Sequence, residues 1–366
     1  MRIGIPKETK VREGRVSCTP GSARMLAQDG HDVLVQTGAG DGSGYEDAAY
    51  ITAGAQIVPT AEDAWAAQMV IKVKEPIESE HAFLREDLIL FTYLHLAADR
   101  PLTDRLVESK TTSIAYETVQ VGRRLPLLEP MSEIAGRMST VVGAFYLSKA
   151  LGGKGVLLGG VPGVLPGHVL VLGGGTAGIN AGRVAAGMGA EVTILEVDLE
   201  KMRFLDITLS NGTHTLYSNE QNLLEVLPSV DLLIGAVLLP GARAPKLIRR
   251  EMLRQMKPGS VFVDIAVDQG GCAETTHATT HDEPTFVEED IVHYCVANMP
   301  GAYSRTATQA LNNATMPYAQ KIANLGLDQA LMQVQELRLG LSTHQGHLTC
   351  EAVADAHDLS HVVYSD

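Results

Sequence analysis

The chain has 366 residues, enough for two domains, and an ordinary globular composition with 45% hydrophobic and 20% charged residues. Its formal net charge of −14 opposes binding to a polyanion, and no basic stretch offsets it, so we expect no nucleic-acid partner. No apolar run reaches the roughly 18 residues of a membrane span, and the N-terminus becomes polar too early for a signal peptide. The charge still allows an anionic small substrate, because one Arg or Lys can dominate a pocket.

The four cysteines are isolated in the sequence and form no C-x-x-C pair. They are Cys18, Cys272, Cys295 and Cys350. This spacing fits neither a disulfide framework nor a metal site, so we expect reduced, mostly structural thiols in a cytoplasmic protein.

The region 1–128 shows short apolar runs that alternate with helical patterns, as in the βαβ units of a parallel sheet. A helix is expected from Ser22 to Gly30, where the glycine is a C-terminal stop signal. Strands are expected at residues 3–5, 33–35, 69–73, 88–92 and 113–116. The first region is therefore expected to form an α/β domain.

The middle of the chain starts with a helical pattern over 132–150, with Ser132 as the cap and Glu133 as the first acid. Glycine and proline then exclude a helix from 152 to 167. A second βαβ series follows, with strands expected at 168–172, 192–195, 232–234, 261–264 and 292–296. This series predicts a second α/β domain.

The C-terminal region shows a helical pattern over 306–325 and then short helices, and the simplest topology returns this tail to the first domain. We therefore predict an α/β protein of two domains. A central domain at 129–304 is inserted in a discontinuous domain made of 1–128 and 305–366.

A glycine-rich turn follows the strand at 168–172 and opens a helical pattern, as in the dinucleotide fingerprint G-x-G-x-x-G. Gly173 allows the tight turn, Gly175 lets the backbone approach a pyrophosphate, and Gly178 lets the helix pack closely on the sheet. The helix N-terminus would face the phosphates. Glu196 ends the next strand at the spacing of the ribose-binding acid, which favours NAD over NADP. We therefore expect a central Rossmann NAD-binding domain at 129–304 and a discontinuous, Rossmann-like substrate domain made of 1–128 and 305–366.

Oxidation of an amino acid at its α-carbon needs cations for the carboxylate and groups that move protons at the amine and at water. Arg15 follows the first strand and a charged loop. Lys72 and Lys74 fall on the same face of their strand, so alternation alone does not choose between them. His95 lies in an apolar run, where a core histidine is the commoner interpretation and a catalyst is the alternative.

Two aspartates compete for the proton chemistry at the end of the strand 261–264. Asp264 ends the strand, and Asp268 lies in the turn before Gly270 and Gly271, where a nicotinamide would lie. The two glycines indicate a close ligand, which favours Asp268.

Segments along essentially the whole chain resemble the alanine dehydrogenase family. They are residues 3–8, 72–76, 91–96, 131–137, 155–164, 268–272 and 293–301. The resemblance implies an NAD-dependent, reversible oxidative deamination of L-alanine to pyruvate and ammonium, with hydride transfer to the nicotinamide. It also implies a homohexamer built through the helices at 132–150 and 306–325.

The resemblance further implies roles for individual residues. Arg15 and Lys74 match the pair that binds the carboxylate and the carbonyl oxygen of the substrate. His95 matches the proton acceptor and donor, and Asp268 matches the acid that handles water and the carbinolamine. Pocket-lining positions are matched by Tyr93, Met131 and Asn298. Cofactor contacts are matched by Ser132, Gly173, Gly175, Thr176, Ala177, Gly178, Glu196, Lys201, Ser218, Val237, Leu238, Ile265, Ala266, Val267, Asp268, Ala297, Asn298 and Met299.

A few positions depart from the family pattern. Gly14 replaces a residue that is often aromatic, and His277 stands where some members carry an Arg near the cofactor. Some members hold magnesium with an acid and a histidine on the late helix, where this chain has Lys321 and Leu325. We therefore expect no metal.

Three other functions fit parts of the pattern. The NAD-binding subunit of a proton-translocating transhydrogenase is similar in fold, but it would need a membrane partner and need not keep both Lys74 and His95. Saccharopine dehydrogenase is a relative with a larger amino-acid substrate. A catalytically silent NAD-binding regulator is the third, and the presence of Arg15, Lys74, His95 and Asp268 argues against it.

Overall fold

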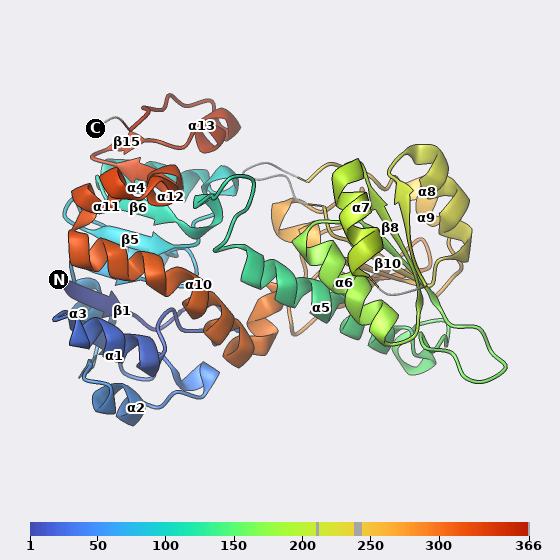
Figure 1. The fold of residues 1–366 in the computed structure, drawn as a ribbon, viewed down its shortest axis with the longest axis horizontal. Coiled ribbons are helices and arrows are strands. Elements are labelled where there is room, and N and C mark those ends of the chain that lie inside the picture. The colour runs from blue at the N-terminus through green and yellow to red at the C-terminus, as the bar shows by residue number, and fades with distance from the viewer. Residues whose placement is uncertain (210–211, 238–243, 365–366) are drawn as a thin grey trace. The chain divides into compact units, whose positions relative to one another are not determined.

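The computed structural model describes residues 1–209, 212–237 and 244–364, and it divides into two compact units. Of these residues, 1–131 and 301–364 form the first unit, and 132–237 and 244–300 form the second. Each unit is an α/β domain built on a mainly parallel sheet (Figure 1). The predicted two-domain α/β fold is confirmed.

In the described ranges, the first unit contains an eight-stranded sheet in the order β15-β14-β6-β5-β4-β1-β2-β3. Its strands are β1 (Arg2–Ile5), β2 (Asp32–Gln36), β3 (Gln56–Val58), β4 (Met69–Ile71), β5 (Ile89–Thr92), β6 (Thr112–Ala115), β14 (Leu341–His344) and β15 (His347–Leu348). The strands β1 to β6 pair in parallel, and Ile3 lies opposite both Val33 and Met69. The two late strands are antiparallel.

Helices connect and cover the strands of the first sheet, and α1 and α10 lie side by side on one of its faces (Figure 1). The helices of this unit are α1 (Pro20–Gln28), α2 (Asp47–Thr52), α3 (Ala61–Trp65), α4 (Arg100–Glu108), α10 (Ser304–Leu325), α11 (Leu327–Gln333), α12 (Gln335–Gly340) and α13 (Glu351–His357). Short 3-10 turns are η1 (Asp41–Ser43), η2 (Glu78–Phe83), η3 (Leu96–Ala98) and η4 (Tyr116–Thr118).

The second unit contains, among its described residues, a seven-stranded sheet in the order β12-β13-β11-β10-β7-β8-β9. Its strands are β7 (His168–Leu172), β8 (Glu191–Glu196), β9 (Thr213–Tyr217), β10 (Leu232–Gly235), β11 (Val261–Asp264), β12 (Thr285–Glu288) and β13 (Ile291–Tyr294). Its helices and 3-10 turns are α5 (Glu129–Tyr146), which starts in the first unit, η5 (Lys149–Leu151), α6 (Thr176–Gly187), α7 (Leu199–Thr208), α8 (Glu220–Val226), η6 (Leu227–Ser229), α9 (Arg250–Leu253), η7 (Ile265–Gln269) and η8 (Met299–Tyr303). Only β12 pairs in the antiparallel sense in this sheet, within the described residues.

The central strands are buried on both faces, which explains their nearly continuous apolar sequences. In the second sheet, Val169, Val171 and Ile234 belong to one hydrophobic cluster, and Leu170 and Leu233 belong to the cluster on the opposite face. Because parallel strands all end at the same edge, the residues that follow them meet there. That edge is where polar side chains gather in each unit.

Every predicted strand is present, with ends that differ by no more than two residues. The helix predicted to begin at Ser132 instead begins at Glu129, so the prediction of Ser132 as its cap is wrong. Pro130 near the helix start needs no amide partner, and Glu129 places a negative charge at the positive helix end. These two residues extend the helix beyond the expected cap.

The tail of the chain joins the first sheet, and β14 pairs with β6 through Leu341 and Ile114. We expected only short helices after Leu325, and the strands β14 and β15 were missed. With four and two residues, these strands are too short to give a clear alternation. No helix in the described ranges has the length and apolar character needed to cross a bilayer.

Candidate functional site

Charged side chains gather where β1, β4 and β5 of the first sheet end. Glu8 follows β1, Lys72 and Lys74 follow β4, and His95 follows β5. The ends of these neighbouring parallel strands lie at one edge of the sheet. The fold therefore brings the sequence-predicted Lys74 and His95 to one place.

Lys72 is fully buried and lies between two carboxylates. Its Nζ atom is 2.7 Å from Glu80 Oε1 and 3.3 Å from Glu8 Oε2. Burial alone would lower the pKa of Lys72, but the charges of Glu8 and Glu80 outweigh burial and raise it. Glu8 also accepts a hydrogen bond of 2.6 Å from the Val73 amide, so the ion pairs fix the backbone that leads to Lys74. Lys72 therefore has a structural role, which leaves Lys74 as the candidate for substrate binding.

Lys74 and His95 contact the same carboxylate. Glu75 Oε2 lies 3.3 Å from Lys74 Nζ and 3.2 Å from His95 Nδ1, and Lys10 pairs with the other oxygen. The backbone of His95 is left-handed, with φ of 52°, and Glu117 accepts a hydrogen bond of 2.6 Å from its amide. A left-handed backbone is uncommon at residues other than glycine, and strained residues of this kind often cluster at functional sites.

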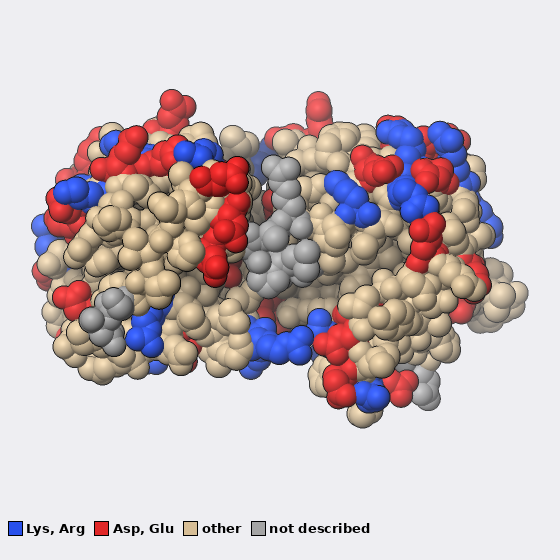
Figure 2. Space-filling model, turned by 90° about the horizontal axis from the view of Figure 1, so that it is seen from above, with Lys and Arg blue, Asp and Glu red and all other residues tan. Residues whose placement is uncertain are grey.

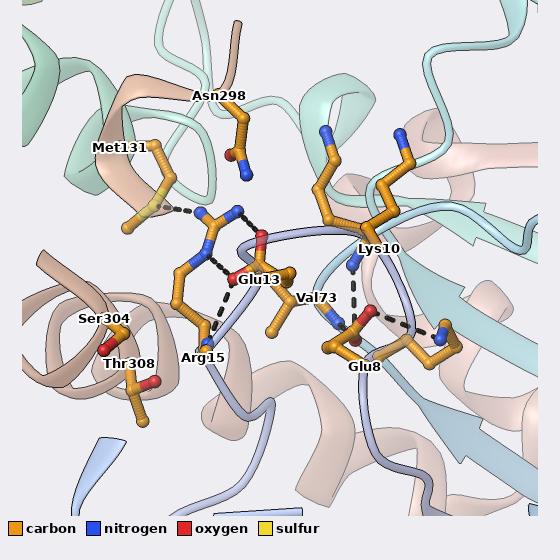
Figure 3. A network of polar contacts seen from close by, with 12 residues as sticks. Glu8, Lys10, Glu13, Arg15, Val73, Met131, Asn298, Ser304 and Thr308 are labelled. Atoms are coloured by element: carbon orange, nitrogen blue, oxygen red, sulfur yellow. Dashed lines mark hydrogen bonds and ion pairs between the residues drawn. The ribbon is translucent and has the colours of Figure 1, made fainter. Parts of the chain in front are cut away.

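Arg15 is buried and makes a charged pair with Glu13, two residues earlier (Figure 3). Arg15 Nε donates to Glu13 Oε1 at 2.7 Å, and Nη2 also pairs with Glu13. Burial alone would lower the pKa of Arg15, but the hydrogen bond and charge of Glu13 outweigh it and raise the pKa. Nη1 lies 3.1 Å from the sulfur of Met131, a predicted pocket position.

The backbone next to Arg15 is tied to helix α10, and the predicted pocket residue Tyr93 lies beside His95. The Val16 amide donates a hydrogen bond of 3.0 Å to the hydroxyl of Thr308 on α10. The predicted pocket residue Tyr93 is buried, donates to the Leu127 carbonyl at 2.6 Å and lies with its ring centroid 5.9 Å from that of His95. Burial raises the pKa of Tyr93 far above its ordinary value, although the charge of Arg15 opposes the shift. Tyr93 is thus an uncharged side chain beside the ring of His95.

The glycine-rich turn of the second unit has the geometry of a pyrophosphate cradle. Gly173 has φ of 94°, and a Cβ atom at Gly178 would lie 1.8 Å from the Gly173 carbonyl oxygen. Gly175 faces open space and lies directly before α6, which begins with Thr176 and Ala177. The turn therefore leaves room for a phosphate at a helix N-terminus, and the residues present fit the expected dinucleotide.

Glu196 lies at the end of β8 beside this turn. Its Oε2 atom accepts a hydrogen bond of 2.9 Å from the Gly174 amide, and Oε1 accepts one of 2.8 Å from the Val197 amide. Lys201 Nζ is 3.7 Å from Glu196 Oε2. The carboxylate is thus held in a fixed orientation next to the phosphate cradle, as a ribose-binding acid requires.

The two competing aspartates have different surroundings. Asp264 is buried and accepts hydrogen bonds from the amides of Ala266 at 2.9 Å and Cys272 at 2.8 Å, so it holds both ends of the turn η7. Burial raises the pKa of Asp264, and these hydrogen bonds only partly offset that shift. Asp268 is exposed on the same turn, and its carboxylate accepts the Asn298 amide at 3.1 Å. Asp264 therefore stabilises the turn, and Asp268 exposes its carboxylate on the surface of the turn.

Most of the other predicted cofactor positions follow strands of the second sheet at their carboxyl ends. They are Ser218 after β9, Val237 after β10, Ile265, Ala266 and Val267 after β11, and Ala297 and Met299 after β13. Ser132 lies inside α5, and Leu238 lies outside the described residues. His277 stacks on Phe286 with ring centroids 3.9 Å apart. No cluster of three or more potential metal ligands occurs in the described part of the chain.

Sequence reasoning missed the carboxylates that partner the cations, above all Glu13, Glu75 and Glu117. The signal was present in part, because Glu13 lies two residues before Arg15 and Glu75 directly follows Lys74. Charge alternation in a loop is common on any protein surface, so only burial and distance distinguish these residues.

The fold and these residues define a two-domain, dinucleotide-dependent α/β protein. The pattern of the "Alanine dehydrogenase/PNT, N-terminal domain" matches residues 4–135, and that of the corresponding C-terminal domain matches residues 139–351. The chain therefore belongs to the alanine dehydrogenase/PNT family.

Relatives within this family match over nearly their full length. Alanine dehydrogenase of Bacillus subtilis (strain 168) is 54% identical over 355 residues, which cover 97% of this chain and 94% of the relative. Alanine dehydrogenase 2 of Staphylococcus aureus (strain NCTC 8325) is 53% identical over 363 residues, with 99% and 98% coverage.

Solved structures are similar as well. An L-alanine dehydrogenase superposes with a TM-score of 0.93 at 50% identity and covers 98% of this chain and 99% of its own. A transhydrogenase from Sinorhizobium meliloti has a TM-score of 0.80 at 24% identity, covering 96% of this chain and 100% of its own, and shares the fold.

The buried ion pairs predict that Lys72 serves stability. Lys72→Met leaves Glu8 and Glu80 buried without their shared cation, and breaking a buried pair in this way typically costs about 3–5 kcal/mol. We expect the free energy of unfolding, measured by urea titration followed by circular dichroism, to fall by this amount.

Lys74→Met is the matched control, because it removes the same charge two residues away. Glu75 keeps other partners in this variant, so the loss of stability should be smaller than for Lys72→Met. An equal loss in both variants would contradict the division of roles.

Proposed function

We propose that the chain is an NAD-dependent alanine dehydrogenase, which converts L-alanine, NAD and water reversibly to pyruvate, ammonium and NADH. The observation that carries the proposal is the shared contact of Lys74 and His95 with Glu75, which places a substrate-binding cation and a proton acceptor together. Membership of the family and the named relatives, which align over nearly the whole chain, support the choice of alanine.

Arg15 and Lys74 are proposed to bind the substrate carboxylate. Their positive charges also oppose a further positive charge on the substrate amine, which helps the amine to lose its proton. When NAD is bound, it supplies the acceptor for the hydride that leaves the α-carbon. The chain's part is to fix the substrate and to move protons around it.

His95 is proposed to take up and return the proton at the substrate oxygen and amine. An imidazole ring has one nitrogen that can accept a proton and one that can donate a proton. Asp268, on the second unit, is proposed to orient the attacking water and to accept its proton, and later to assist the collapse of the carbinolamine. Tyr93, Met131 and Asn298 are proposed to line the pocket.

The cofactor is proposed to contact the fingerprint turn, Glu196 and the carboxyl-end loops of the second sheet. The proposed contacts are Ser132, Gly173, Gly175, Thr176, Ala177, Gly178, Lys201, Ser218, Val237, Leu238, Ile265, Ala266, Val267, Asp268, Ala297, Asn298 and Met299. The open space at Gly175 and the oriented carboxylate of Glu196 support this assignment. We also place the enzyme in the cytoplasm, because Cys18, Cys272, Cys295 and Cys350 are all free thiols.

Turnover tests the proposed function directly. We expect the purified chain to reduce NAD in the presence of L-alanine, and His95→Asn and Asp268→Asn each to lower kcat by about two orders of magnitude or more, the scale of general acid–base groups. Absorbance at the wavelength of reduced nicotinamide follows the reaction.

The exposed residues His347 and Asp206 provide matched controls, and His347→Asn and Asp206→Asn should turn over at the wild-type rate. NAD affinity should survive in His95→Asn, because His95 lies in the other unit from the fingerprint turn. Wild-type turnover by a folded His95→Asn protein would refute its proposed role.

Cofactor preference depends on the charge of Glu196. Glu196→Gln keeps an oxygen that can accept the Gly174 amide, but it removes the charge that would repel a 2′-phosphate. We expect the preference for NAD over NADP, as a ratio of kcat/KM values, to fall about tenfold, since about 1.4 kcal/mol of repulsion corresponds to that factor. Equal use of NAD and NADP by the wild type would contradict the assignment.

Assembly as a homohexamer is the last part of the proposal, with α5 and α10 as contacts. Exposed apolar side chains lie on α5 and in the segment 152–167 that follows η5, among them Phe145 (62% exposed), Leu157 (68%) and Leu165 (88%). An apolar surface of this kind is typical of a subunit contact, and a second copy of the chain would cover it.

Phe145→Asp should therefore lower the mass of the assembly in light scattering, because it buries a charge in the contact. Phe204→Asp is the control, since Phe204 is similarly exposed (58%) but lies on α7. A monomeric wild type would rule out the assembly.

A further inference from the structure

Glu75 is a carboxylate with several charged partners at the edge of the first sheet. Its side chain is 12% exposed and contacts three cationic or ionisable groups. One oxygen, Oε2, is shared by Lys74 Nζ at 3.3 Å and His95 Nδ1 at 3.2 Å, and the other pairs with Lys10.

The contact decides which ring nitrogen of His95 carries a proton. An ionised carboxylate only accepts hydrogen bonds, so His95 Nδ1 must donate to Glu75. In the neutral ring, Nε2 is then the acceptor. Nε2 has no hydrogen-bond partner among the described residues, and a third of the His95 side chain is exposed (33%). The contact therefore turns the proton-accepting nitrogen away from Glu75.

A second carboxylate fixes the backbone beneath the ring. Glu117 accepts the amides of Leu94 at 3.1 Å and His95 at 2.6 Å, which holds His95 in its left-handed conformation. Glu117 thus holds the main chain, and Glu75, from the end of a different strand, holds the ring. When both the main chain and the ring of His95 are fixed, its Nε2 atom points in one direction, and proton transfer occurs along that direction.

We propose that Glu75 is a positioning residue for His95, which fixes the tautomer and direction of the ring and ties it to the substrate-binding Lys74. This inference rests on the proposed function for the role of His95 in the reaction. Glu75 also stabilises the imidazolium that forms when Nε2 accepts a proton, as an adjacent carboxylate does in other histidine sites.

The surroundings keep Glu75 ionised, as this role requires. Burial alone would raise the pKa of Glu75, but the hydrogen bond from His95 and the charges of Lys74, His95 and Lys10 outweigh burial and hold the pKa well below its ordinary value. Lys10 comes from the loop after β1, Lys74 from that after β4 and His95 from that after β5.

The kinetic test uses Glu75→Gln and Glu75→Leu. The first variant removes the charge and keeps an acceptor, and the second removes both. We expect kcat to fall about tenfold in Glu75→Gln and about a hundredfold in Glu75→Leu, the range for residues that orient a functional histidine. KM for L-alanine should change less than kcat, because Lys74 remains in place.

The pH profile separates positioning from general stability. An ionised carboxylate beside the ring favours its protonated form, and alanine oxidation needs the ring without that proton. The acidic limb of the kcat/KM profile should therefore move to lower pH in Glu75→Gln. Glu78→Gln is the control, because Glu78 is exposed three residues later, and its profile should match the wild type.

A readout without turnover completes the experiment. Nitrogen NMR of the ¹⁵N-histidine-labelled chain, with His95→Asn for assignment, should show His95 protonated at Nδ1 in the wild type and a mixture of tautomers in Glu75→Leu. Unchanged kcat and pH limb in folded Glu75→Gln, or the same tautomer in wild type and Glu75→Leu, would overturn the inference. A wild type inactive with L-alanine would instead overturn the proposed function, and the NMR result would still decide the role of Glu75.

Discussion

The ammonium group of Lys72 is fully buried, and its ion pairs with Glu8 and Glu80 are the constraint on which the site depends. An unpaired charge at this depth would cost several kcal/mol, so the two carboxylates must remain with the lysine. Glu8 extends the arrangement to the backbone through the Val73 amide. The loop after β4 is therefore rigid at the point where it presents Lys74.

The other cations at this edge of the sheet are also paired with a carboxylate. Arg15 is paired with Glu13, and Lys74 shares Glu75 with His95. Each cation is thus ordered before a substrate arrives, and less entropy is lost when an anionic ligand binds. The parallel sheet makes this possible, since it brings loops that are far apart in the sequence to one edge.

The sequence was sufficient to predict the buried parallel strands, the glycine fingerprint and the cations, because each has a local pattern. Short elements such as β14 and β15 gave too few residues for a pattern, and the start of α5 depended on Pro130 rather than on the expected cap Ser132. The carboxylate partners could not be predicted, because Glu117 lies 22 residues from the His95 amide that it binds. Such pairings are formed by the three-dimensional fold, which brings the ends of different strands together.

The central claim is that the chain removes a hydride from the α-carbon of alanine and delivers it to NAD. Turnover of L-alanine deuterated at the α-carbon, followed by mass spectrometry of the reduced cofactor, tests this claim most directly. We predict that the reduced cofactor carries the deuterium and that kcat/KM is lower than with unlabelled alanine when the transfer limits the rate. Reduced cofactor without the label, or no reduced cofactor at all, would contradict the account.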